Sequence, residues 1–225
     1  MKKCSLPTRK ECLNIIKEHH VPSHILKHNL AVAKLAVFLA ERLREKGVQV
    51  DVDLVHRACL LHDVLRVCDF KKSGYAGSQH DVTHQDKAKW GRLKAKYKDA
   101  CHEDAAFALL KDRYPELALA IKKHRYAALL DDKDRPTSWE EKLVYYADKR
   151  VMHDRIVALK ERLDEAHERH ARSHGTTARS KADTVRVDHL IFELENEIFD
   201  KLGLDPLDVT DESIDSYKDA GQVNG

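Results

Sequence analysis

Two neighbouring residues, His62 and Asp63, are the strongest candidates for chemistry in this chain. They follow the apolar run Ala-Cys-Leu-Leu at residues 58–61, so the helix is expected to be buried where the pair begins. A buried aspartate is costly unless it pairs with a cation or binds a metal. Adjacent helical side chains diverge by about 100°, yet a pair near a helix end can still hold one ion. The alternative is a solvated pair at the end of a helix.

Two further residues break the apolar pattern of their own helices. His28 shares a helical stripe with Val32, Leu35 and Leu39, and is therefore expected to face the core. A single buried histidine needs only a hydrogen bond, which is the alternative for His28. Asp148 is expected in the middle of an apolar helix, with its basic sequence neighbours pointing elsewhere. We interpret it as a buried carboxylate that needs a cation.

His102 and His124 lie at the ends of two further helices whose inner faces are apolar. Each is weak evidence alone, but the set joins six metal-binding side chains on five predicted helices. Imidazole and carboxylate suit Mn, Fe, Co, Ni or Zn, and carboxylate also admits Mg. The candidate metal ligands are His28, His62, Asp63, His102, His124 and Asp148.

Helix start and stop signals predict the elements that must position these residues. A T-x-x-E capping box at residues 8–11 opens a short first helix. A second, almost wholly apolar helix begins at residues 22–23 and ends at Gly47. Asp51 or Asp53 caps a third helix, which carries the histidine–aspartate pair at its end.

The second half of the chain shows the same helical spacing, with no internal repeat and no convincing strand. We expect a loop and a basic segment in 71–100, helices at 103–113, 115–125 and 183–202, and a frayed tail after Leu207. A second capping box, Ser138 with Glu141, opens a long helix that is expected to reach His167. The fold class is therefore all-α, a single antiparallel helical bundle.

Composition narrows the function classes. Lys and Arg number 40 against 38 Asp and Glu, so the net charge of +2 does not indicate a dedicated nucleic-acid binder. No stretch approaches the roughly 20 apolar residues that span a membrane, and no signal peptide is recognisable. Five cysteines without a CxxC pair make disulfides and a thiolate zinc site unexpected. These features are typical of a cytoplasmic enzyme or binding protein.

The ordered histidines and aspartates resemble the HD superfamily of metal-dependent phosphohydrolases, over about residues 20–165. The resemblance rests on HNLAVAKLA from His28, ACLLHDVLR around the doublet and SWEEKLVYYADKR around Asp148. Together with the helix signals, it divides the chain into an N-terminal helix at 1–20, a metal-binding helical domain of the HD type at 21–168, a C-terminal helix packing on it at 169–205, and a polar tail at 206–225.

The resemblance also assigns metal ligands. His28, His62, Asp63 and Asp148 would hold one divalent metal. His102 and His124 match the extra histidines of members that bind two metals bridged by the aspartate of the doublet. His80 and His84 compete with His102 for that place, but lie in a segment without an apolar face.

Catalytic roles follow from the same resemblance. The family's frequent H-D-I-G-K reads His62-Asp63-Val64-Leu65-Arg66 here, so the glycine is lost and the cation is kept. Asp63 and Arg66 are the candidate catalytic residues, because an arginine fork suits a phosphate. Arg66, Lys149 and Arg125 are the candidate substrate-binding residues. Lys71, Lys72 and the basic segment 87–98 could attract a nucleotide, although charge runs are usually solvated surface.

Three functions fit these residues. The first is hydrolysis of a phosphoester, in a nucleotide or another small phosphorylated molecule, by metal-activated water. The second is a di-iron oxygenase, since some proteins of this fold use the same six ligands with iron and oxygen. The third is a metal- or nucleotide-binding regulatory module without turnover. A homodimer through the apolar stripe of the last helix is possible, but closure of the core is the favoured use of that stripe.

Overall fold

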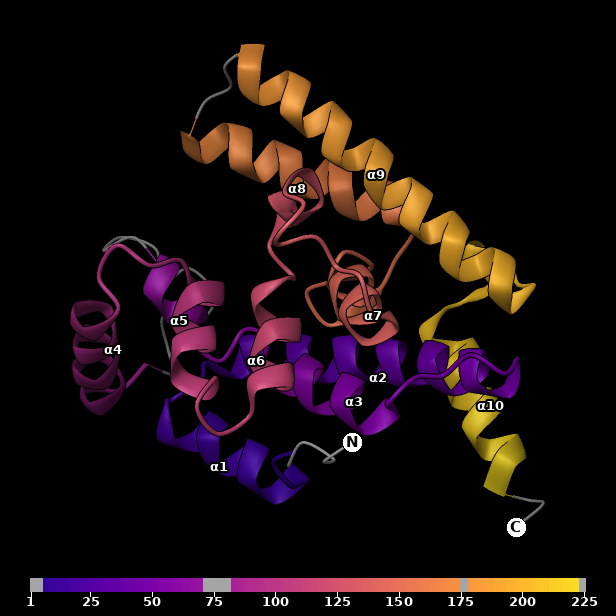
Figure 1. Cartoon of the computed structure of the whole chain (residues 1–225). Coiled ribbons are helices and arrows are strands. Elements are labelled where there is room, and N and C mark those ends of the chain that lie inside the picture. Colours follow the sequence, from indigo (N-terminus) through magenta and orange to yellow (C-terminus); the bar gives the residue numbers. More distant parts are fainter. Residues whose placement is uncertain (1–5, 71–81, 175–177, 223–225) are drawn as a thin grey trace.

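The computed structural model describes residues 6–70, 82–174 and 178–222, and these are built almost entirely of helices (Figure 1). The predicted all-α class is confirmed. In chain order the elements are α1 (Arg9–Glu18), α2 (Ser23–Glu45), α3 (Val52–Leu61), η1 (Arg66–Asp69), α4 (His84–Lys96), α5 (His102–Leu110), α6 (Pro115–Lys122), η2 (Tyr126–Leu130), α7 (Trp139–Asp148), β1 (Val151–Met152), β2 (Arg155–Ile156), α8 (Leu159–His174), α9 (Ala178–Leu202), η3 (Pro206–Asp208) and α10 (Asp211–Gln222).

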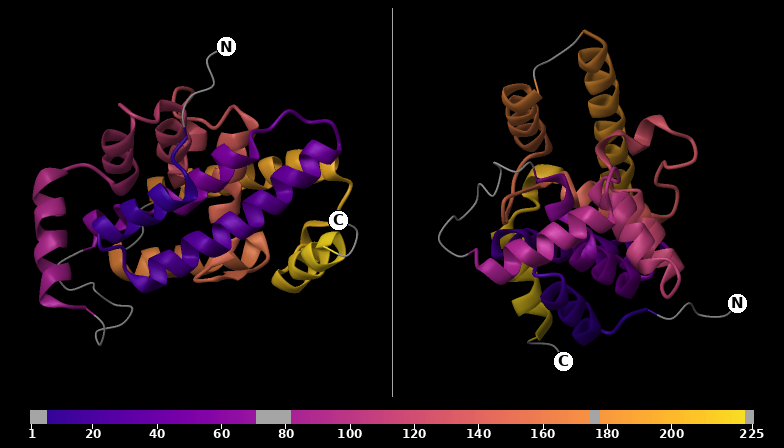
Figure 2. Two further views of the ribbon diagram at one scale, coloured as in Figure 1. Left: turned by 90° about the horizontal axis from the view of Figure 1, so that it is seen from below. Right: turned by 90° about the vertical axis from the view of Figure 1, so that its left-hand side faces the viewer.

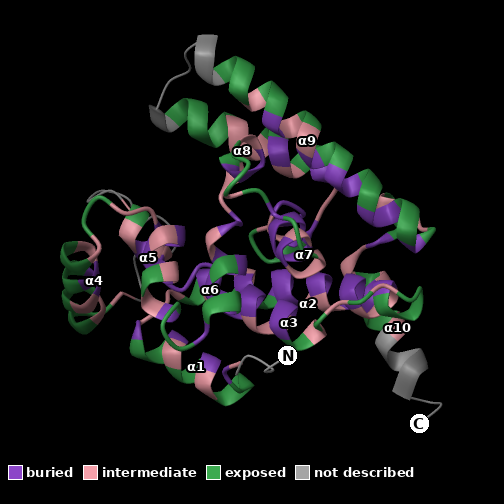
Figure 3. Ribbon diagram, in the orientation of Figure 1, coloured by how far each residue is buried: buried purple, intermediate pink, exposed green. Residues whose placement is uncertain are grey.

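The long helix α2 lies at the centre of the fold, as its apolar sequence predicts. Leu35, Leu39 and Leu43 are fully buried, and the helix packs against α3 and α7 (Figure 3). Gly47 follows the last turn with φ of +84°, a left-handed conformation that glycine adopts without strain. The predicted end of α2 at Gly47 is thereby confirmed.

Side-chain caps set where α3 and α7 begin. Asp51, one of the two predicted caps, accepts a hydrogen bond of 3.0 Å from the backbone N–H of Leu54. Ser138 and Glu141 form the predicted capping box at the start of α7. These caps align two helices whose far ends carry the histidine–aspartate pair and Asp148, respectively.

The long helix expected from Ser138 to His167 is wrong, because α7 ends at Asp148. A two-stranded antiparallel hairpin follows, with Val151 paired to Ile156, and α8 begins only at Leu159. Tertiary contacts override the local helical spacing here: the guanidinium of buried Arg150 donates to Val157 O at 2.7 Å. Asp148 thus lies at a helix end and not in mid-helix.

Helices α8 and α9 extend from the same side of α7 (Figure 1). Most of the apolar stripe of α9 is buried within the chain, as expected for closure of the core; the buried members are Ile191, Leu194, Ile198, Phe199 and Leu202. Phe192, also expected in the stripe, is exposed. The Asp188 carboxylate on α9 accepts a hydrogen bond of 2.7 Å from the Tyr126 hydroxyl group, and it lies 2.8 Å from His167 Nε2.

The tail expected to fray after Leu207 instead contains η3 and α10, so that expectation is wrong for residues 211–222. Val209 and Ile214 are buried, and Lys34 on α2 forms an ion pair of 2.9 Å with Asp215. Apolar contacts with α2 order this segment where composition alone predicts fraying.

Helices α4 and α10 lie toward opposite ends of the structure (Figure 2). Helix α4 contains most of the predicted basic segment. Trp90 on this helix contacts the turn after α1, where its indole N–H donates to His20 O at 2.8 Å. No helix in the described part of the chain is both long and apolar enough to cross a membrane.

Candidate metal centre

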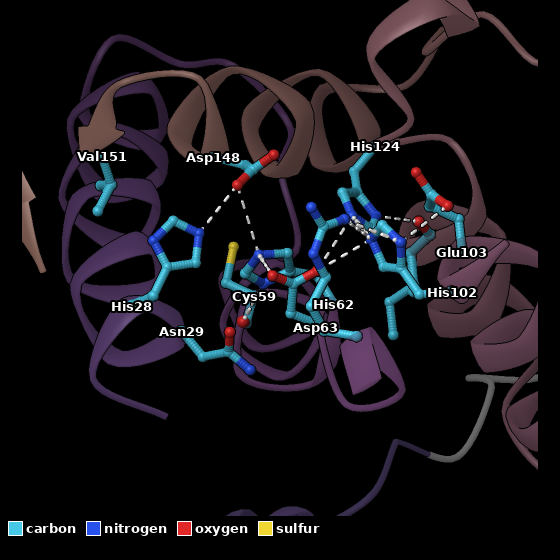
Figure 4. Close-up of polar contacts among 12 residues, drawn as sticks. His28, Asn29, Cys59, His62, Asp63, His102, Glu103, His124, Asp148 and Val151 are labelled. Carbon is cyan, nitrogen blue, oxygen red and sulfur yellow. Dashed lines mark hydrogen bonds and ion pairs between the residues drawn. The ribbon is translucent and has the colours of Figure 1, made fainter. Parts of the chain in front are cut away.

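The fold brings all six predicted ligands together between α2, α3, α5, α6 and α7 (Figure 4). His62 and Asp63 directly follow α3, and Asp148 is the last residue of α7. The remaining histidines are placed by three other helices: His28 lies on α2, His102 begins α5 and His124 follows α6. Four of the six residues are buried, each with at most 7% of its surface exposed; they are His62, Asp63, His102 and His124.

Each of the four histidines is held from outside the centre through its Nδ1 atom. Three Nδ1 atoms contact backbone carbonyls and the fourth contacts a carboxylate. The pairs are His28 with His153 O at 2.8 Å, His62 with Cys59 O at 2.8 Å, His124 with Ile121 O at 2.5 Å, and His102 with Asp69 Oδ2 at 2.5 Å. An Nδ1–H that donates to these acceptors leaves the Nε2 lone pair directed inward, the usual arrangement of metal-binding histidine.

One half of the centre is organised around Asp148. Its Oδ1 atom lies 3.0 Å from His28 Nε2 and 3.5 Å from His62 Nε2. The His62 Nε2 atom is buried and has no hydrogen-bond partner. A buried polar atom without a partner carries a desolvation cost, so this nitrogen fits a ligand position.

The other half is organised around Asp63. Its Oδ1 atom lies 3.0 Å from His102 Nε2 and 3.8 Å from His124 Nε2. The two Nε2 atoms are themselves only 3.1 Å apart. Because both rings use Nδ1 as the donor, their Nε2 lone pairs would face each other. A proton or a cation between them removes that repulsion.

The donor atoms form overlapping triads whose members lie within 4.8 Å of one another. The triads in the centre are His28–His62–Asp63, His62–His124–Asp148 and Asp63–His102–His124. Ligands about 2.0–2.1 Å from a tetrahedral ion lie roughly 3.3 Å from each other. The distances between the donors therefore fit a first-row divalent metal. His62, Asp63 and His124 each belong to two triads. Of these three, only Asp63 has a side chain with two donor atoms available for two ions.

The charged groups of the centre shift one another's pKa values. Burial opposes ionisation of Asp63, but the charges of His62 and Arg66 hold its pKa well below the usual value. Burial also lowers the pKa of His102, yet Asp63 and Asp69 outweigh burial and raise that pKa to about 9. The centre thus holds ionised carboxylates, which favour a bound cation.

Lys149 is closer to the centre than its sequence position indicates. The expectation that it points away from Asp148 is wrong, since its Nζ atom lies 2.5 Å from Asp148 Oδ2. The same ammonium donates to His124 O at 2.9 Å and lies over the Tyr145 ring. Lys149 caps the end of α7, where the chain turns and the long side chain folds back.

The other two candidate substrate-binding residues differ in position. Arg66 is 39% exposed, and its Nη1 atom lies 3.3 Å from Asp69 and 3.0 Å from His102 Nδ1. Arg125 instead turns toward Asp104 and lies 2.5 Å from its carboxylate. The structure therefore places Arg66 at the edge of the centre and pairs Arg125 outside it.

Two carboxylates that the sequence did not single out support His102. Besides Asp69, Glu103 Oε2 lies 3.1 Å from His102 Nδ1, and the Glu103 side chain is only 9% exposed. Glu103 directly follows a candidate ligand, which is a recognisable signal. Asp69 had no comparable signal, because the turn that aims it at α5 is not evident from spacing.

The competing histidines fall outside the centre or outside the described residues. His84 is exposed at the first position of α4 and belongs to none of the metal-type groups in the described part of the chain. His80, Lys71 and Lys72 lie outside the described residues. Within the basic segment, Lys94 donates to Phe70 O, so this lysine fastens α4 to the end of η1.

Comparison with known proteins agrees with this architecture. The model of the HD domain family matches residues 25–153, which include all six candidate ligands. An uncharacterised protein of Methanocaldococcus jannaschii, MJ0778, is 30% identical over 167 residues, covering 70% of this chain and 88% of the relative. No solved structure matches the chain. The family match spans more than half of the sequence, and the chain belongs to the HD domain family.

Proposed function

We propose that the protein is a metal-dependent phosphohydrolase that acts on a nucleotide or another small phosphorylated molecule. The observation that carries the proposal is the orientation of four imidazoles. Each is anchored through Nδ1, so that four Nε2 atoms and two carboxylates converge on one buried centre. A purely structural cluster has no need to leave the buried His62 Nε2 without a partner.

The donor set fits one or two divalent ions. His28, His62, Asp63 and Asp148 would hold the first, and His102 and His124 would complete a second site that shares Asp63. Nitrogen and carboxylate donors accept Mn, Mg, Fe, Co, Ni or Zn. A bound ion of this kind lowers the pKa of coordinated water and so supplies a nucleophile near neutral pH.

The chain's own residues would orient the reaction. Asp63 and Asp148 hold negative charge in the centre, and the Nδ1 contacts fix each imidazole ring. Arg66 lies beside His102 and remains 39% exposed, so its guanidinium can reach both the centre and an incoming ligand. A planar guanidinium binds two oxygens of a phosphoryl group and stabilises charge that develops there. Lys149, which contacts Asp148, is a second candidate for substrate contacts, whereas Arg125 is paired with Asp104 outside the centre.

A cytoplasmic location is also part of this proposal. Four cysteines in the described part of the chain, Cys12, Cys59, Cys68 and Cys101, are free thiols. Thiols persist in reducing compartments, whereas disulfides are typical of oxidising ones. The free thiols support the location without bearing on the reaction.

The test combines metal content with turnover in one preparation. Untagged protein would be analysed for elements, then assayed with phosphatase and phosphodiesterase substrates under added Mn, Mg, Co and Ni. Asp63→Asn removes the shared carboxylate and should lose bound metal and at least about 100-fold of the activity, with unchanged helicity. Asp112→Asn, an exposed carboxylate outside the centre, is the matched control.

The outcomes separate the three candidate functions. About one or two metals per chain with metal-dependent release of phosphate or nucleotide supports the hydrolase. Iron near two per chain without hydrolysis points to the oxygenase. No bound metal and no activity with any added metal would overturn the proposal and leave a binding module. Normal turnover by Asp63→Asn would also overturn the assignment of the site.

A further inference from the structure

A cavity away from the metal centre is lined by residues in and beside α1, α4 and α5. Figure 1 shows these three helices at one end of the structure. The volume of the cavity is about 430 Å³, within the roughly 300–1,000 Å³ range of small-molecule pockets. We call it the α4 pocket; its lining residues are Ile15, Glu18, His19, Lys89, Arg92, Leu93, Lys96, Leu109, Leu110, Arg113 and Tyr114. None of these is a candidate metal ligand.

One wall of the α4 pocket is cationic. Lys89, Arg92 and Lys96 follow one another at spacings of three and four residues, so they share a face of α4. None of the three forms an ion pair with a carboxylate among the described residues. Arg113 adds a fourth cation from beyond α5, although it is paired with Glu11 at 2.9 Å. The lining thus has an excess of positive charge, because Glu18 is the one carboxylate among its residues.

The lining residues from outside α4 are mostly apolar but include two polar acceptors. Leu110 and Tyr114 are buried beside the pocket. His19 is 7% exposed, and its Nδ1 lies 2.8 Å from Ile15 O, so its Nε2 is left as an acceptor. Burial lowers the pKa of His19 and outweighs the hydrogen bond to Ile15 and the charge of Glu18, which raise it. Glu18 supplies the second acceptor.

We propose that the α4 pocket binds a nucleoside phosphate at a site separate from the metal centre. Lys89, Arg92 and Lys96 would hold the phosphates, since cations and phosphate oxygens form strong hydrogen bonds. The apolar wall would contact the base. Glu18 and His19 would accept from ribose hydroxyls or base amino groups.

The two walls together select this ligand class. Inorganic phosphate would use the cations alone and leave the apolar wall in contact with water. An apolar molecule without charge would leave the cations unused. A ligand that is anionic at one end and flat and apolar at the other uses both walls, and a nucleoside phosphate has this chemistry.

The α4 pocket and the metal centre share helix α5. His102 begins that helix, while Leu109 and Leu110 in its last turn line the pocket. The two sites nevertheless have no lining residue in common. Occupancy of the pocket is therefore measurable without a functional metal centre, and it does not depend on the proposed reaction.

The experiment is calorimetric titration of the full-length protein with ADP, GDP, CDP and UDP at constant ionic strength. It is run on the native sequence and on Asp63→Asn, which disables the metal centre but not the pocket. The pocket variant combines Lys89→Glu with Arg92→Glu. Its matched control combines Lys87→Glu with Lys98→Glu, two exposed cations that do not line the pocket and give the same change in net charge.

We expect at least one diphosphate to bind Asp63→Asn, with affinity about tenfold or more lower in the pocket variant and little changed in the control. A milder pair, Lys89→Gln with Arg92→Gln, should give the same direction if the glutamate pair disturbs folding. Absence of binding by all four diphosphates to Asp63→Asn would overturn the proposal. Equal weakening by the control pair would also overturn it, because general attraction to a basic helix would then explain the binding.

Discussion

The Nε2 atoms of His102 and His124 lie 3.1 Å apart, although each ring directs its Nδ1 atom to an acceptor outside the centre. Two neutral rings in this arrangement would oppose their lone pairs across a buried space. Asp63 Oδ1 lies 3.0 Å from the first of these nitrogens, so negative charge is concentrated at the same point. A cation that binds both nitrogens and the carboxylate resolves all three interactions together.

Divalent metal is therefore expected to stabilise the folded protein. A ligand at 100 times its Kd that binds only the folded state adds about 2.7 kcal/mol. Thermal unfolding of protein treated with EDTA, then titrated with Mn, Co or Zn, measures the effect. His124→Gln should lose most of the metal-induced rise in Tm, whereas His189→Gln, whose side chain is 72% exposed, should retain it. An equal rise in both variants would place the metal elsewhere.

Much of the candidate centre could be predicted because its residues violate the pattern of their own helices. His28 lies on an apolar stripe and His62 follows an apolar run, and both positions can be recognised without a structure. The predicted caps at Asp51 and Ser138 are also confirmed, since capping depends on neighbours within four residues. Local signals thus identified the candidate ligands that the fold brings together, and the helices that carry them.

The features that were missed depend on contacts far apart in the sequence. The helix expected to reach His167 ends at Asp148, and the guanidinium of Arg150 beyond it donates to carbonyl groups that follow the hairpin and lie in the η3 region. Lys149 reaches Asp148 only because α7 ends there. The α4 pocket likewise requires three helices to meet. Helical periodicity carries no information about these tertiary contacts.

Arg66 is expected to contribute to turnover more than to metal binding. Its guanidinium lies beside His102 without being a metal donor, since an arginine offers no lone pair. Arg66→Ala should lower kcat/KM by about 100- to 1,000-fold, the usual cost of losing a donor to developing charge. Metal content per chain should stay unchanged.

Arg66→Lys distinguishes charge from geometry in the same assay. A lysine keeps the positive charge but cannot bind two phosphate oxygens in a fixed plane. Only partial recovery is expected, visible in kcat more than in KM. Full activity of Arg66→Ala with normal metal content would remove Arg66 from the proposed mechanism. Arg172→Ala, at an exposed position on α8, serves as the control.

Buried Arg150 is expected to be a major contributor to stability. It is 1% exposed and donates to Val157 O, Pro206 O and Val209 O, while its Nη1 atom lies 3.3 Å from Glu195. Arg150→Met would leave the carboxylate and the carbonyls without their donor. Breaking a buried ion pair on one side costs about 3–5 kcal/mol, measurable as a lower urea midpoint.

A double substitution tests how much of that loss in stability comes from the unpaired carboxylate of Glu195. Arg150→Met with Glu195→Met removes both charges, so part of the stability should return. The carbonyl groups stay unsatisfied, and recovery should therefore be incomplete. Arg155→Met, at an exposed position in the hairpin, should change the midpoint little. A midpoint for Arg150→Met equal to that of this control would contradict the prediction.

Glu141 is expected to make stability depend on pH. Its Oε2 atom accepts from Lys123 Nζ at 2.8 Å and from the backbone N–H of Thr137 at 2.7 Å. Burial raises the pKa of Glu141, but the hydrogen bonds from Lys123 and from the backbone outweigh it and lower the pKa below 4.5. Glu141→Gln should cost about 3 kcal/mol at pH 7, because it leaves a buried lysine without its charge partner.

The direction of this pH dependence follows from the lowered pKa of Glu141 in the folded state. A carboxyl group that ionises more readily when folded stabilises the protein above its unfolded pKa and loses this contribution as the pH falls. The difference in free energy of unfolding between the native sequence and Glu141→Gln should thus be largest near pH 7 and shrink below about pH 4.5. Urea unfolding at pH 7, 6, 5 and 4 measures it. Glu116→Gln, an exposed control on α6, should differ little from the native sequence at every pH. A constant difference for Glu141→Gln from pH 7 to pH 4 would show that the carboxylate is not ionised preferentially in the fold.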